Sequence, residues 1–256
     1  MTHLSRPLNL KKSLGQHFLK DESVCRQIID SLKQNPFRRL LEIGPGAGAL
    51  TRHLVSLKGV DFKAVEIDRE KVAFLKKHYP VLNDRIIEID FLQMEKPFDG
   101  PFTIIGNFPY NISTEILFKV LGWRENVERV IGMFQKEVAQ RITAAEGNKI
   151  YGVTSVLLQA FFEVEYLFEV GERAFDPPPK VKSAVIRLTP KKEPTPMRTE
   201  KMFFLLVKTA FNQRRKTLRN AVRGLFTDDL LQDPLFNKRA EQLTILQFAE
   251  LTWKMK

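Results

Sequence analysis

Between residues 21 and 187, short apolar runs alternate with amphipathic stretches, and this alternation constrains the fold more than any other feature of the sequence. RRLLEI, FKAVEI and FTIIG are typical of buried strands, whereas DESVCRQIIDSLKQ and DREKVAFLKKHY carry apolar residues at helical spacing. Strands that alternate with helices predict a parallel, doubly wound sheet. FEVEYLFEV and SAVIRLT follow with little helix between them, so we expect an antiparallel edge.

A proline-rich segment, TPKKEPTPM at 189–197, has no apolar periodicity and is the best candidate for a linker. The residues after it contain helical patterns and no convincing strand. We therefore expect an α/β domain over residues 1–190 and a small, all-helical domain over residues 198–256.

Composition excludes several classes of protein. The single cysteine, Cys25, rules out a disulfide framework and any Cys-clustered metal site, and we expect no metal ion. No apolar run approaches the ~18 residues that a membrane-spanning helix needs. The first residues also lack the apolar core of a signal peptide, so we expect a cytoplasmic protein.

The net charge of +11 is concentrated at the two ends of the chain. Residues 1–40 carry 8 basic and 3 acidic side chains, and residues 181–256 carry 16 and 7, whereas residues 41–180 carry 17 and 20. Basic groups segregated in this way predict that a polyanion lies across part of the surface.

Two basic clusters are candidates for that contact. Between Lys201 and Thr227 there are seven basic residues and no acidic one, and the four-residue spacing of three arginines predicts one phosphate-binding helical face. The N-terminal cluster either holds nucleic acid at the mouth of a site or belongs to a flexible arm. The candidate RNA-binding residues are Lys11, Lys12, Arg214, Arg215, Lys216, Arg219 and Arg223.

A glycine-rich turn, LLEIGPGAGALT, stands between a predicted strand and a predicted helix and brings backbone close to a ligand. The spacing of Gly44, Gly46 and Gly48 is neither that of dinucleotide dehydrogenases nor that of phosphate-binding loops. No lysine follows to meet a phosphate. Glu42 would oppose a phosphate and suits a ligand with a cationic end.

Two further carboxylates follow predicted strands. Glu66 lies 22 residues after Gly44, where a carboxylate accepts both hydroxyls of a ribose. Asp90 follows the next strand candidate and could accept from the exocyclic amine of adenine. Together these residues describe a nucleoside with a positively charged tail, so S-adenosylmethionine fits better than NAD.

The motif GNFPYNIS (106–113) follows the strand FTIIG at the edge where ligands bind in such folds. The side-chain oxygen of Asn107 and a backbone carbonyl can accept both N–H groups of an exocyclic amine and favour a pyramidal nitrogen. Pro109 fixes the loop so that carbonyls turn inward. Tyr110 offers an aromatic face to a flipped-out base.

These motifs resemble those of the ribosomal RNA adenine dimethyltransferases. KSLGQHFL (12–19), VEIDRE, GNFPYNIS and AFDPPPKVKSAV (174–185) occur in the order found in that family. AFNQRRKTLRNAV (210–222) resembles the KsgA-type enzymes of the small ribosomal subunit in particular. The resemblance spans nearly the whole chain and implies a Rossmann-like, S-adenosylmethionine-dependent methyltransferase sheet, mostly parallel with an antiparallel edge.

The resemblance also implies roles for individual residues, including an N-terminal segment within 1–20 that covers the cofactor. The residues expected to contact S-adenosylmethionine are His17, Leu19, Gly44, Gly46, Glu66, Asp90 and Asn107. The residues expected to hold the target adenine are Asn107, Pro109, Tyr110 and, from the other side of the base, Phe175. The chain departs from the family at His17, usually Asn, and at Phe108, usually Leu; we expect activity to be retained.

The function that the resemblance implies is the N6,N6-dimethylation of two adjacent adenines near the 3′ end of small-subunit (16S) rRNA, with an immature 30S particle as partner and a monomeric enzyme. Two alternatives remain at this point. One is a large-subunit (23S) rRNA adenine methyltransferase of the macrolide-resistance type. The other is a non-catalytic RNA-binding assembly factor, against which the intact NFPY motif argues.

Overall fold

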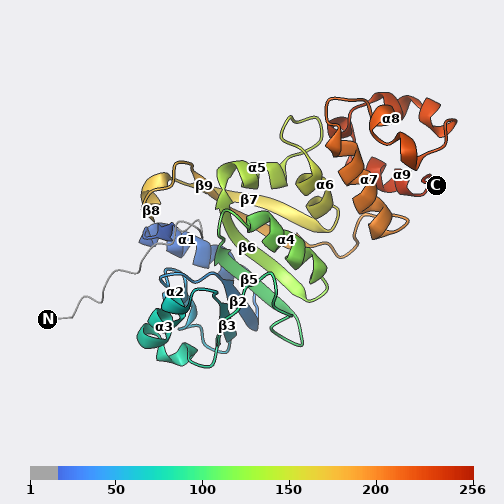
Figure 1. Ribbon diagram of the computed structural model, residues 1–256. Helices are drawn as coiled ribbons and strands as arrows, with labels where there is room; N and C mark the ends of the chain where they lie inside the picture. Colours follow the sequence, from blue (N-terminus) through green and yellow to red (C-terminus); the bar gives the residue numbers. More distant parts are fainter. Residues whose placement is uncertain (1–16) are drawn as a thin grey trace. The chain divides into compact units, whose positions relative to one another are not determined.

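A computed structural model of the protein describes residues 17–256 (Figure 1). It divides into two compact units. The first comprises the described residues up to Ala139 together with Glu165–Thr189, and the second comprises Gln140–Val164 together with Pro190–Lys256. The linear division predicted from the sequence, 1–190 and 198–256, stays a prediction; the compact units differ from it in that 140–164 belong with the C-terminal residues.

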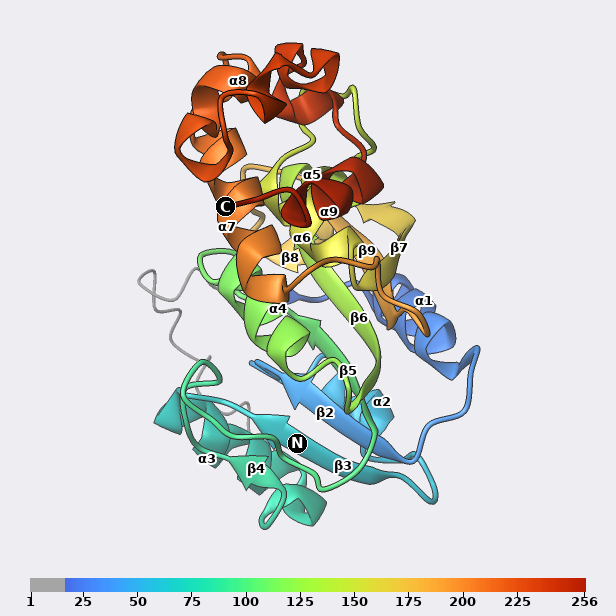
Figure 2. The ribbon, with the colours of Figure 1, turned by 90° about the vertical axis from the view of Figure 1, so that its right-hand side faces the viewer.

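A seven-stranded sheet has the strand order β4-β3-β2-β5-β6-β9-β7. The neighbouring strands from β4 through β6 run parallel, and β9 pairs with β6 antiparallel, as expected. Figure 2 shows β3, β2, β5 and β6 side by side. The strands are β2 (Arg39–Ile43), β3 (Asp61–Val65), β4 (Ile86–Ile87), β5 (Phe102–Asn107), β6 (Val127–Gln135), β7 (Phe162–Val170) and β9 (Ser183–Pro190).

The strand order reverses between β2 and β5. From β2 the chain proceeds outward through β3 to β4, and it then returns to β5 on the other side of β2. Ligands of open α/β sheets bind outside the carboxyl ends of the strands at such a reversal. The fold therefore directs attention to the loops after β2 and β5, which are the glycine-rich turn and the NFPY motif.

Helices connect and cover the strands. Their bounds are α1 (Glu22–Lys33), α2 (Thr51–Leu54), α3 (Arg69–His78), α4 (Ser113–Gly122), α5 (Lys136–Thr143), α6 (Val153–Gln159), α7 (Glu200–Asn212), α8 (Leu218–Ala221) and α9 (Ile245–Thr252). The caps explain where two of them begin: the Asp21 carboxylate accepts from the backbone N–H groups of Ser23 and Val24, and Asp68 accepts from that of Glu70.

The apolar core of the first unit is formed by one face of α1 together with buried side chains of the strands. Ile28, Leu32 and Cys25 on α1 are buried there with Leu40 of β2 and Phe62 of β3. Burial of each large aliphatic side chain contributes about 1.5–3 kcal/mol to stability. This core holds the sheet, and hence the strand ends that carry the motifs, in place.

A second, two-stranded sheet was not predicted from the sequence. β1 (Phe18–Leu19) pairs antiparallel with β8 (Phe175–Asp176), in a register that sets Leu19 opposite Phe175. The backbone N–H of Lys20 donates to the Ala174 carbonyl at 2.8 Å and continues this pairing. The segment expected to cover a cofactor is therefore attached to the residues before β9.

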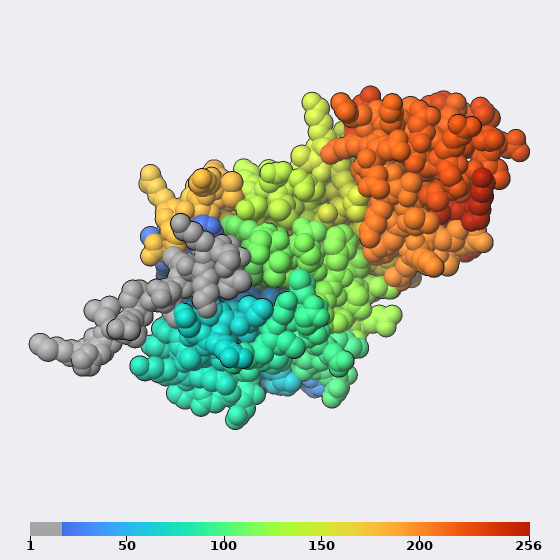
Figure 3. All heavy atoms as spheres, viewed as in Figure 1, coloured from blue at the N-terminus to red at the C-terminus, as the bar shows by residue number. Residues whose placement is uncertain are grey.

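The C-terminal residues are helical, as expected. Residues 191–256, all of them described, form helices and short turns and no strand. In the space-filling view of Figure 3 these residues, orange to red, form one continuous group of atoms, and α7 contacts both α8 and α9. α6, which the sequence did not predict, joins this unit, where Tyr151 and Phe211 meet edge to face at 6.1 Å between ring centroids.

The predicted single helical face of arginines is wrong. α7 ends at Asn212, a turn follows in which the N–H of Lys216 donates to the Gln213 carbonyl, and Thr217 is extended. Arg215 lies in this turn, Arg219 in α8 and Arg223 in the 3-10 turn that follows. An extended residue inside the basic run interrupts the helical repeat on which the expectation depended.

Candidate functional site

A cavity of about 230 Å³ lies at the reversal of strand order, between the ends of β2 and β5. Most of the motif residues singled out in the sequence meet on its walls. Its described lining includes His17, Phe18, Leu19, Glu42, Gly44, Gly46, Glu66, Lys71, Asp90, Asn107, Phe108, Pro109 and Tyr110.

The glycine-rich turn follows β2 and requires its glycines for two reasons. Gly46 and Gly48 have φ angles of +56° and +83°, a region that L side chains rarely adopt. A Cβ atom on Gly48 would also lie 2.9 Å from the ring of Tyr79, and one on Gly46 would lie 3.4 Å from the ring of Phe18. The turn is therefore compact, with the backbone of Gly44 and Gly46 forming cavity wall.

Glu42 lies at the end of β2 and is 2 % exposed. The hydroxyl of Thr51 donates to its Oε2 at 2.7 Å. The pKa of Glu42 is raised from 4.5 to about 8: burial is the largest cause, the Thr51 hydrogen bond opposes the rise, and the nearby carboxylate of Glu66 adds to it. A cationic group in the cavity would favour the ionised form of this carboxyl.

Glu66 and Asp90 are both on the cavity wall, and backbone N–H groups orient both carboxylates. Glu66 is buried; it accepts from the N–H of Gly46 at 3.2 Å and from that of Asp68 at 3.0 Å. Asp90 accepts from the N–H of Leu92 at 2.9 Å. Because each carboxylate oxygen can accept more than one hydrogen bond, both groups retain acceptor capacity for a ligand.

Asn107 is the last residue of β5, and its side-chain amide has a defined orientation. Its Nδ2 lies 3.2 Å from the backbone carbonyl oxygen of His17. A carbonyl only accepts, so Nδ2 is the atom that donates, and Oδ1 is left as the acceptor for a substrate amine. The ring of Pro109 packs beside Gly44, 3.7 Å from the position that a Cβ atom on it would take.

Tyr110 is held from two sides. Its hydroxyl shares a hydrogen bond of 2.5 Å with the hydroxyl of Ser183, the first residue of β9. Burial raises the pKa of Tyr110, with the Ser183 hydrogen bond opposing that rise. The imidazole of His17 stacks against the phenol ring, with 5.8 Å between ring centroids and 29° between ring planes.

Phe175 pairs with the cavity-wall residue Leu19, and its expected role at the target base stays a prediction. Its side chain is 0 % exposed and belongs to the apolar core, and the described cavity lining does not include it. The pairing of β8 with β1 gives the reason, because it fixes Phe175 opposite the buried Leu19. Phe108, which the cavity lining does include, is buried and meets Phe134 edge to face at 5.1 Å.

Three contributors to this site were missed in the sequence. Thr51 and Ser183 carry no motif signal, since a hydroxyl that orients another side chain has no fixed spacing. Lys71 did give a signal: it lies on the apolar stripe of α3 with Val72 and Leu75 and is 2 % exposed. Its ammonium lies 5.2 Å from the ring centroid of Phe18 on the cavity wall.

The candidate RNA-binding residues of the C-terminal unit divide into two groups. Arg214 forms an ion pair of 2.9 Å with Glu241 and donates to the backbone carbonyls of Lys149 and Tyr151, and Arg219 donates to the Leu231 carbonyl at 2.7 Å. Arg215, Lys216 and Arg223 form the second group and are exposed, as is Arg214 beside its ion pair. Lys11 and Lys12 lie outside the described residues.

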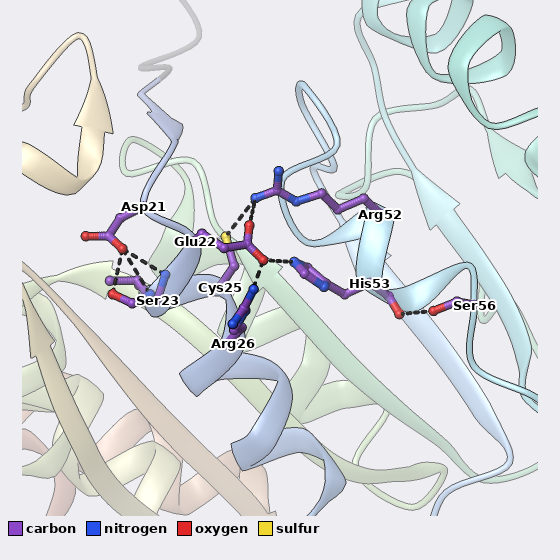
Figure 4. A network of polar contacts seen from close by, with 9 residues as sticks. Asp21, Glu22, Ser23, Cys25, Arg26, Arg52, His53 and Ser56 are labelled. Carbon is purple, nitrogen blue, oxygen red and sulfur yellow. Dashed lines mark hydrogen bonds and ion pairs between the residues drawn. The ribbon is translucent and has the colours of Figure 1, made fainter.

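A polar network outside the cavity ties α1 to α2 (Figure 4). The carboxylate of Glu22 contacts Arg26 at 3.3 Å, His53 at 3.1 Å and also Arg52. Cys25 lies beside this network, fully buried, and burial raises the pKa of its thiol.

Two kinds of feature are absent from the described residues. Within residues 17–256, no cluster of three or more His, Cys, Asp or Glu side chains is arranged to hold a metal ion. None of the helices in the described chain combines the length and apolar character that a bilayer crossing requires.

Comparison with known proteins decides the family. Residues 8–254 match the sequence profile of the family described as "Ribosomal RNA adenine dimethylase". The chain belongs to this family. It is 52 % identical over 246 residues to "Ribosomal RNA small subunit methyltransferase A" of Cytophaga hutchinsonii, covering 94 % of this chain and 95 % of that protein. The protein of the same name from Flavobacterium johnsoniae is 50 % identical over 250 residues, covering 96 % and 95 %.

Solved structures agree with this family membership. The dimethyladenosine transferase of Plasmodium falciparum superimposes with a TM-score of 0.77 and 26 % identity over 92 % of this chain and 96 % of that one. The 23S rRNA methyltransferase ErmE has a TM-score of 0.67 and 24 % identity, covering 91 % and 99 %, and it shows the fold alone. The predicted methyltransferase sheet and family are confirmed, and the chain is an rRNA adenine dimethyltransferase.

Enzymes of this family use S-adenosylmethionine as methyl donor, and the residues present fit it. The glycine turn leaves a cradle that a Cβ atom would fill, and Glu66 and Asp90 present oriented acceptors. Glu42 presents a buried acid to the cationic end of such a ligand. These observations argue for the cofactor from the structure itself.

Proposed function

We propose that the protein dimethylates N6 of two adjacent adenines in the 3′-terminal hairpin loop of 16S rRNA, on immature 30S particles. It acts in the cytoplasm, as a monomer and without a metal ion. The names of its relatives support the small subunit as the substrate, since those relatives are called small-subunit methyltransferases. The segment AFNQRRKTLRNAV supports the same choice over the large-subunit alternative.

The orientation of Asn107 is the observation that carries this proposal. Its Oδ1 is an acceptor on the wall of a cavity whose lining also includes Glu66 and Asp90. An exocyclic amine that donates to Oδ1 and to a backbone carbonyl of the same loop is drawn toward a pyramidal geometry. Its lone pair then leaves conjugation with the ring and becomes available for methylation.

The remaining residues position the two reactants. When bound, S-adenosylmethionine supplies an electrophilic methyl group. Glu66 holds the ribose, Asp90 the adenine amine, and Leu19 with Gly44 and Gly46 packs against the rest of the molecule. Pro109 shapes the loop and Tyr110 stacks on the target base. No general base is needed, because the amine becomes acidic only after it accepts the methyl group. Proximity and alignment account for the catalysis.

Arg215, Lys216 and Arg223 are proposed to contact phosphates, together with Lys11 and Lys12 of the N-terminal arm. Arg214 and Arg219 were also expected to do so. Their hydrogen bonds within the unit support a structural contribution beside any contact with RNA.

The proposal is tested with the purified full-length protein on two substrates: unmethylated immature 30S particles and naked 23S rRNA. We expect methylation of two adjacent adenines of 16S rRNA, located by mass spectrometry. Methylation of 23S rRNA alone would overturn the assignment in favour of the large-subunit class. Asn107→Ala is expected to lower kcat by about 100-fold or more while the cofactor still binds. If it methylated normally, the catalytic assignment would be wrong.

A further inference from the structure

Lys119, on α4, contacts the turn after β4 that carries Asp90. Its ammonium donates to the backbone carbonyl of Leu92 at 2.9 Å. The backbone N–H of Leu92 in turn donates to Oδ1 of Asp90 at 2.9 Å. Leu92 is therefore held at both of its backbone polar groups. Asp90 and Leu92 line the cavity, whereas Lys119 is not among the described lining residues.

The turn is closed by its own backbone, but the direction of the Asp90 side chain depends on Leu92. The carbonyl of Asp90 accepts from the N–H groups of Gln93 and Met94, at 2.9 and 3.1 Å. These two bonds close the chain, and the Leu92 N–H orients the carboxylate. A hydrogen bond from an ammonium restrains a peptide more strongly than a neutral one does. Removing the ammonium would therefore loosen the residue that orients Asp90.

The side chain of Lys119 is itself held in place. It is half-buried, and its ammonium lies 5.1 Å from the ring centroid of Trp123 and 5.9 Å from that of Phe91. The two rings meet edge to face with 5.4 Å between their centroids. Aromatic faces attract an ammonium at such distances. Because the buried Phe91 directly follows Asp90, the turn both packs against this lysine and accepts a hydrogen bond from it.

We propose that Lys119 is a positioning residue for the adenine of the cofactor and that it acts through Asp90. The inference rests on the proposed function, in which Asp90 accepts from the exocyclic amine of that adenine. It adds a residue from outside the cavity that sets the preference for an amine at this place. α4 begins at Ser113, the last residue of the GNFPYNIS motif, so the helix that follows the target-base loop also fixes the cofactor's adenine subsite.

Two variants of Lys119 and one matched control test this role. Lys119→Met removes the ammonium and keeps an apolar chain of similar length, whereas Lys119→Arg keeps a charged donor. The control is Lys63→Met on β3. Lys63 has the same two kinds of contact with the connection between β4 and β5: its ammonium donates to the Pro97 carbonyl at 2.7 Å and lies 4.6 Å from the ring centroid of Phe98. None of these three residues is in the described cavity lining.

The probes are S-adenosylhomocysteine and its deaminated analogue S-inosylhomocysteine, which has a carbonyl oxygen in place of the exocyclic amine. Titration calorimetry of the purified full-length protein gives a Kd for each. We expect Lys119→Met to raise the Kd for S-adenosylhomocysteine by about fivefold, the scale of one hydrogen bond, and to change that for the analogue by less than about twofold. A merely structural role would raise both values alike. Lys119→Arg should restore the preference for the amine, and Lys63→Met should match the wild type.

The outcomes separate this inference from the proposed function. An equal rise of both Kd values in Lys119→Met, no rise in either, or the same loss of preference in Lys63→Met would each overturn the role of Lys119. A wild type that binds the two ligands equally well would overturn the assignment of Asp90 to the adenine amine, and the inference with it. A wild type that prefers the adenine ligand but does not methylate 16S rRNA would overturn the proposed substrate alone, and a lost preference in Lys119→Met would still support the role of Lys119.

Discussion

The hydroxyl of Thr51 donates to the buried carboxyl of Glu42 at 2.7 Å, directly behind the glycine-rich turn. Glu42 is a cavity-wall residue with a pKa raised by burial to about 8, so it is mostly protonated at neutral pH before a ligand arrives. A cationic cofactor favours the ionised form. The charge state of this one group therefore links cofactor binding to proton release.

Cofactor affinity is accordingly expected to rise with pH up to about 8 and then to level off, with release of a proton on binding below that pH. Calorimetric titration at pH values on both sides of 8, in two buffers of different ionisation enthalpy, measures the proton count. The amino group of S-adenosylmethionine titrates in the same range. The variant Glu42→Gln lacks the titrating carboxyl, so its proton release measures the contribution of the cofactor's amino group alone. This variant is the control. Identical proton release by the wild type and by this variant would contradict the prediction.

Glu42 should also make stability depend on pH. Its folded-state pKa of about 8 exceeds the ordinary value of 4.5, so between these pH values the folded protein binds more protons than the unfolded chain. The sign follows: its contribution to stability is fully present below pH 4.5 and is lost as pH rises toward 8. The Tm of the wild type is expected to fall relative to that of Glu42→Gln across this interval. A Tm difference between the two proteins that stays constant from pH 4.5 to pH 8 would contradict this prediction.

Gly48→Ala is expected to destabilise the protein through two separable causes. Its φ of +83° disfavours any L side chain, and the added Cβ atom would lie 2.9 Å from the Tyr79 ring. Gly59→Ala is a matched control, because Gly59 has a φ of +73° and open space around it. We expect a loss of about 1 kcal/mol for the control and about 2–3 kcal/mol for Gly48→Ala, measured by chemical denaturation. Equal losses of unfolding free energy in the two variants would show that the Tyr79 ring moves away from the added Cβ atom at little cost.

Two sets of basic residues in the C-terminal unit should differ in what their replacement by Ala changes: RNA binding for one set and thermal stability for the other. Replacing both Arg215 and Lys216 by Ala should weaken RNA binding and lower the slope of log affinity against log salt by about 0.7–0.9 per lost phosphate contact, with little change in Tm. Arg214→Ala should lower the Tm, because it removes an ion pair with Glu241 and a hydrogen bond to Tyr151. If the double variant had a lowered Tm and Arg214→Ala had an unchanged Tm, the RNA-binding role of the first pair and the structural role of Arg214 would both be wrong.

The parallel direction of the main strands and the placement of the site could be predicted because local patterns determine them. Apolar runs in RRLLEI and FTIIG mark strands that are buried, and a parallel sheet brings their carboxyl ends to one edge. The turn after β2 and the motif after β5 therefore meet at the reversal of strand order. Residues that follow this rule, such as Glu66 and Asn107, were found from the sequence and lie on the cavity wall.

What escaped prediction depends on contacts between distant parts of the chain. The burial of Phe175 by the pairing of β8 with β1 was not foreseen, because no spacing in the sequence announces a two-residue strand; its place at the target base stays a prediction. The arginine face failed because extended Thr217 interrupts a repeat that looked continuous. The hydroxyl of Ser183 reaches Tyr110 across 73 positions, a distance over which periodicity carries no information.

The attachment of β1 to β8 also bears on the order in which the protein becomes functional during its synthesis. His17 and Leu19 are translated early, yet the partners that hold them, Pro177 and Phe175, follow about 160 positions later. A nascent chain that stops short of those partners can form the first strands and the glycine turn, but its cavity stays open on one side. The enzyme therefore acquires a closed binding site only when more than two thirds of it has been made.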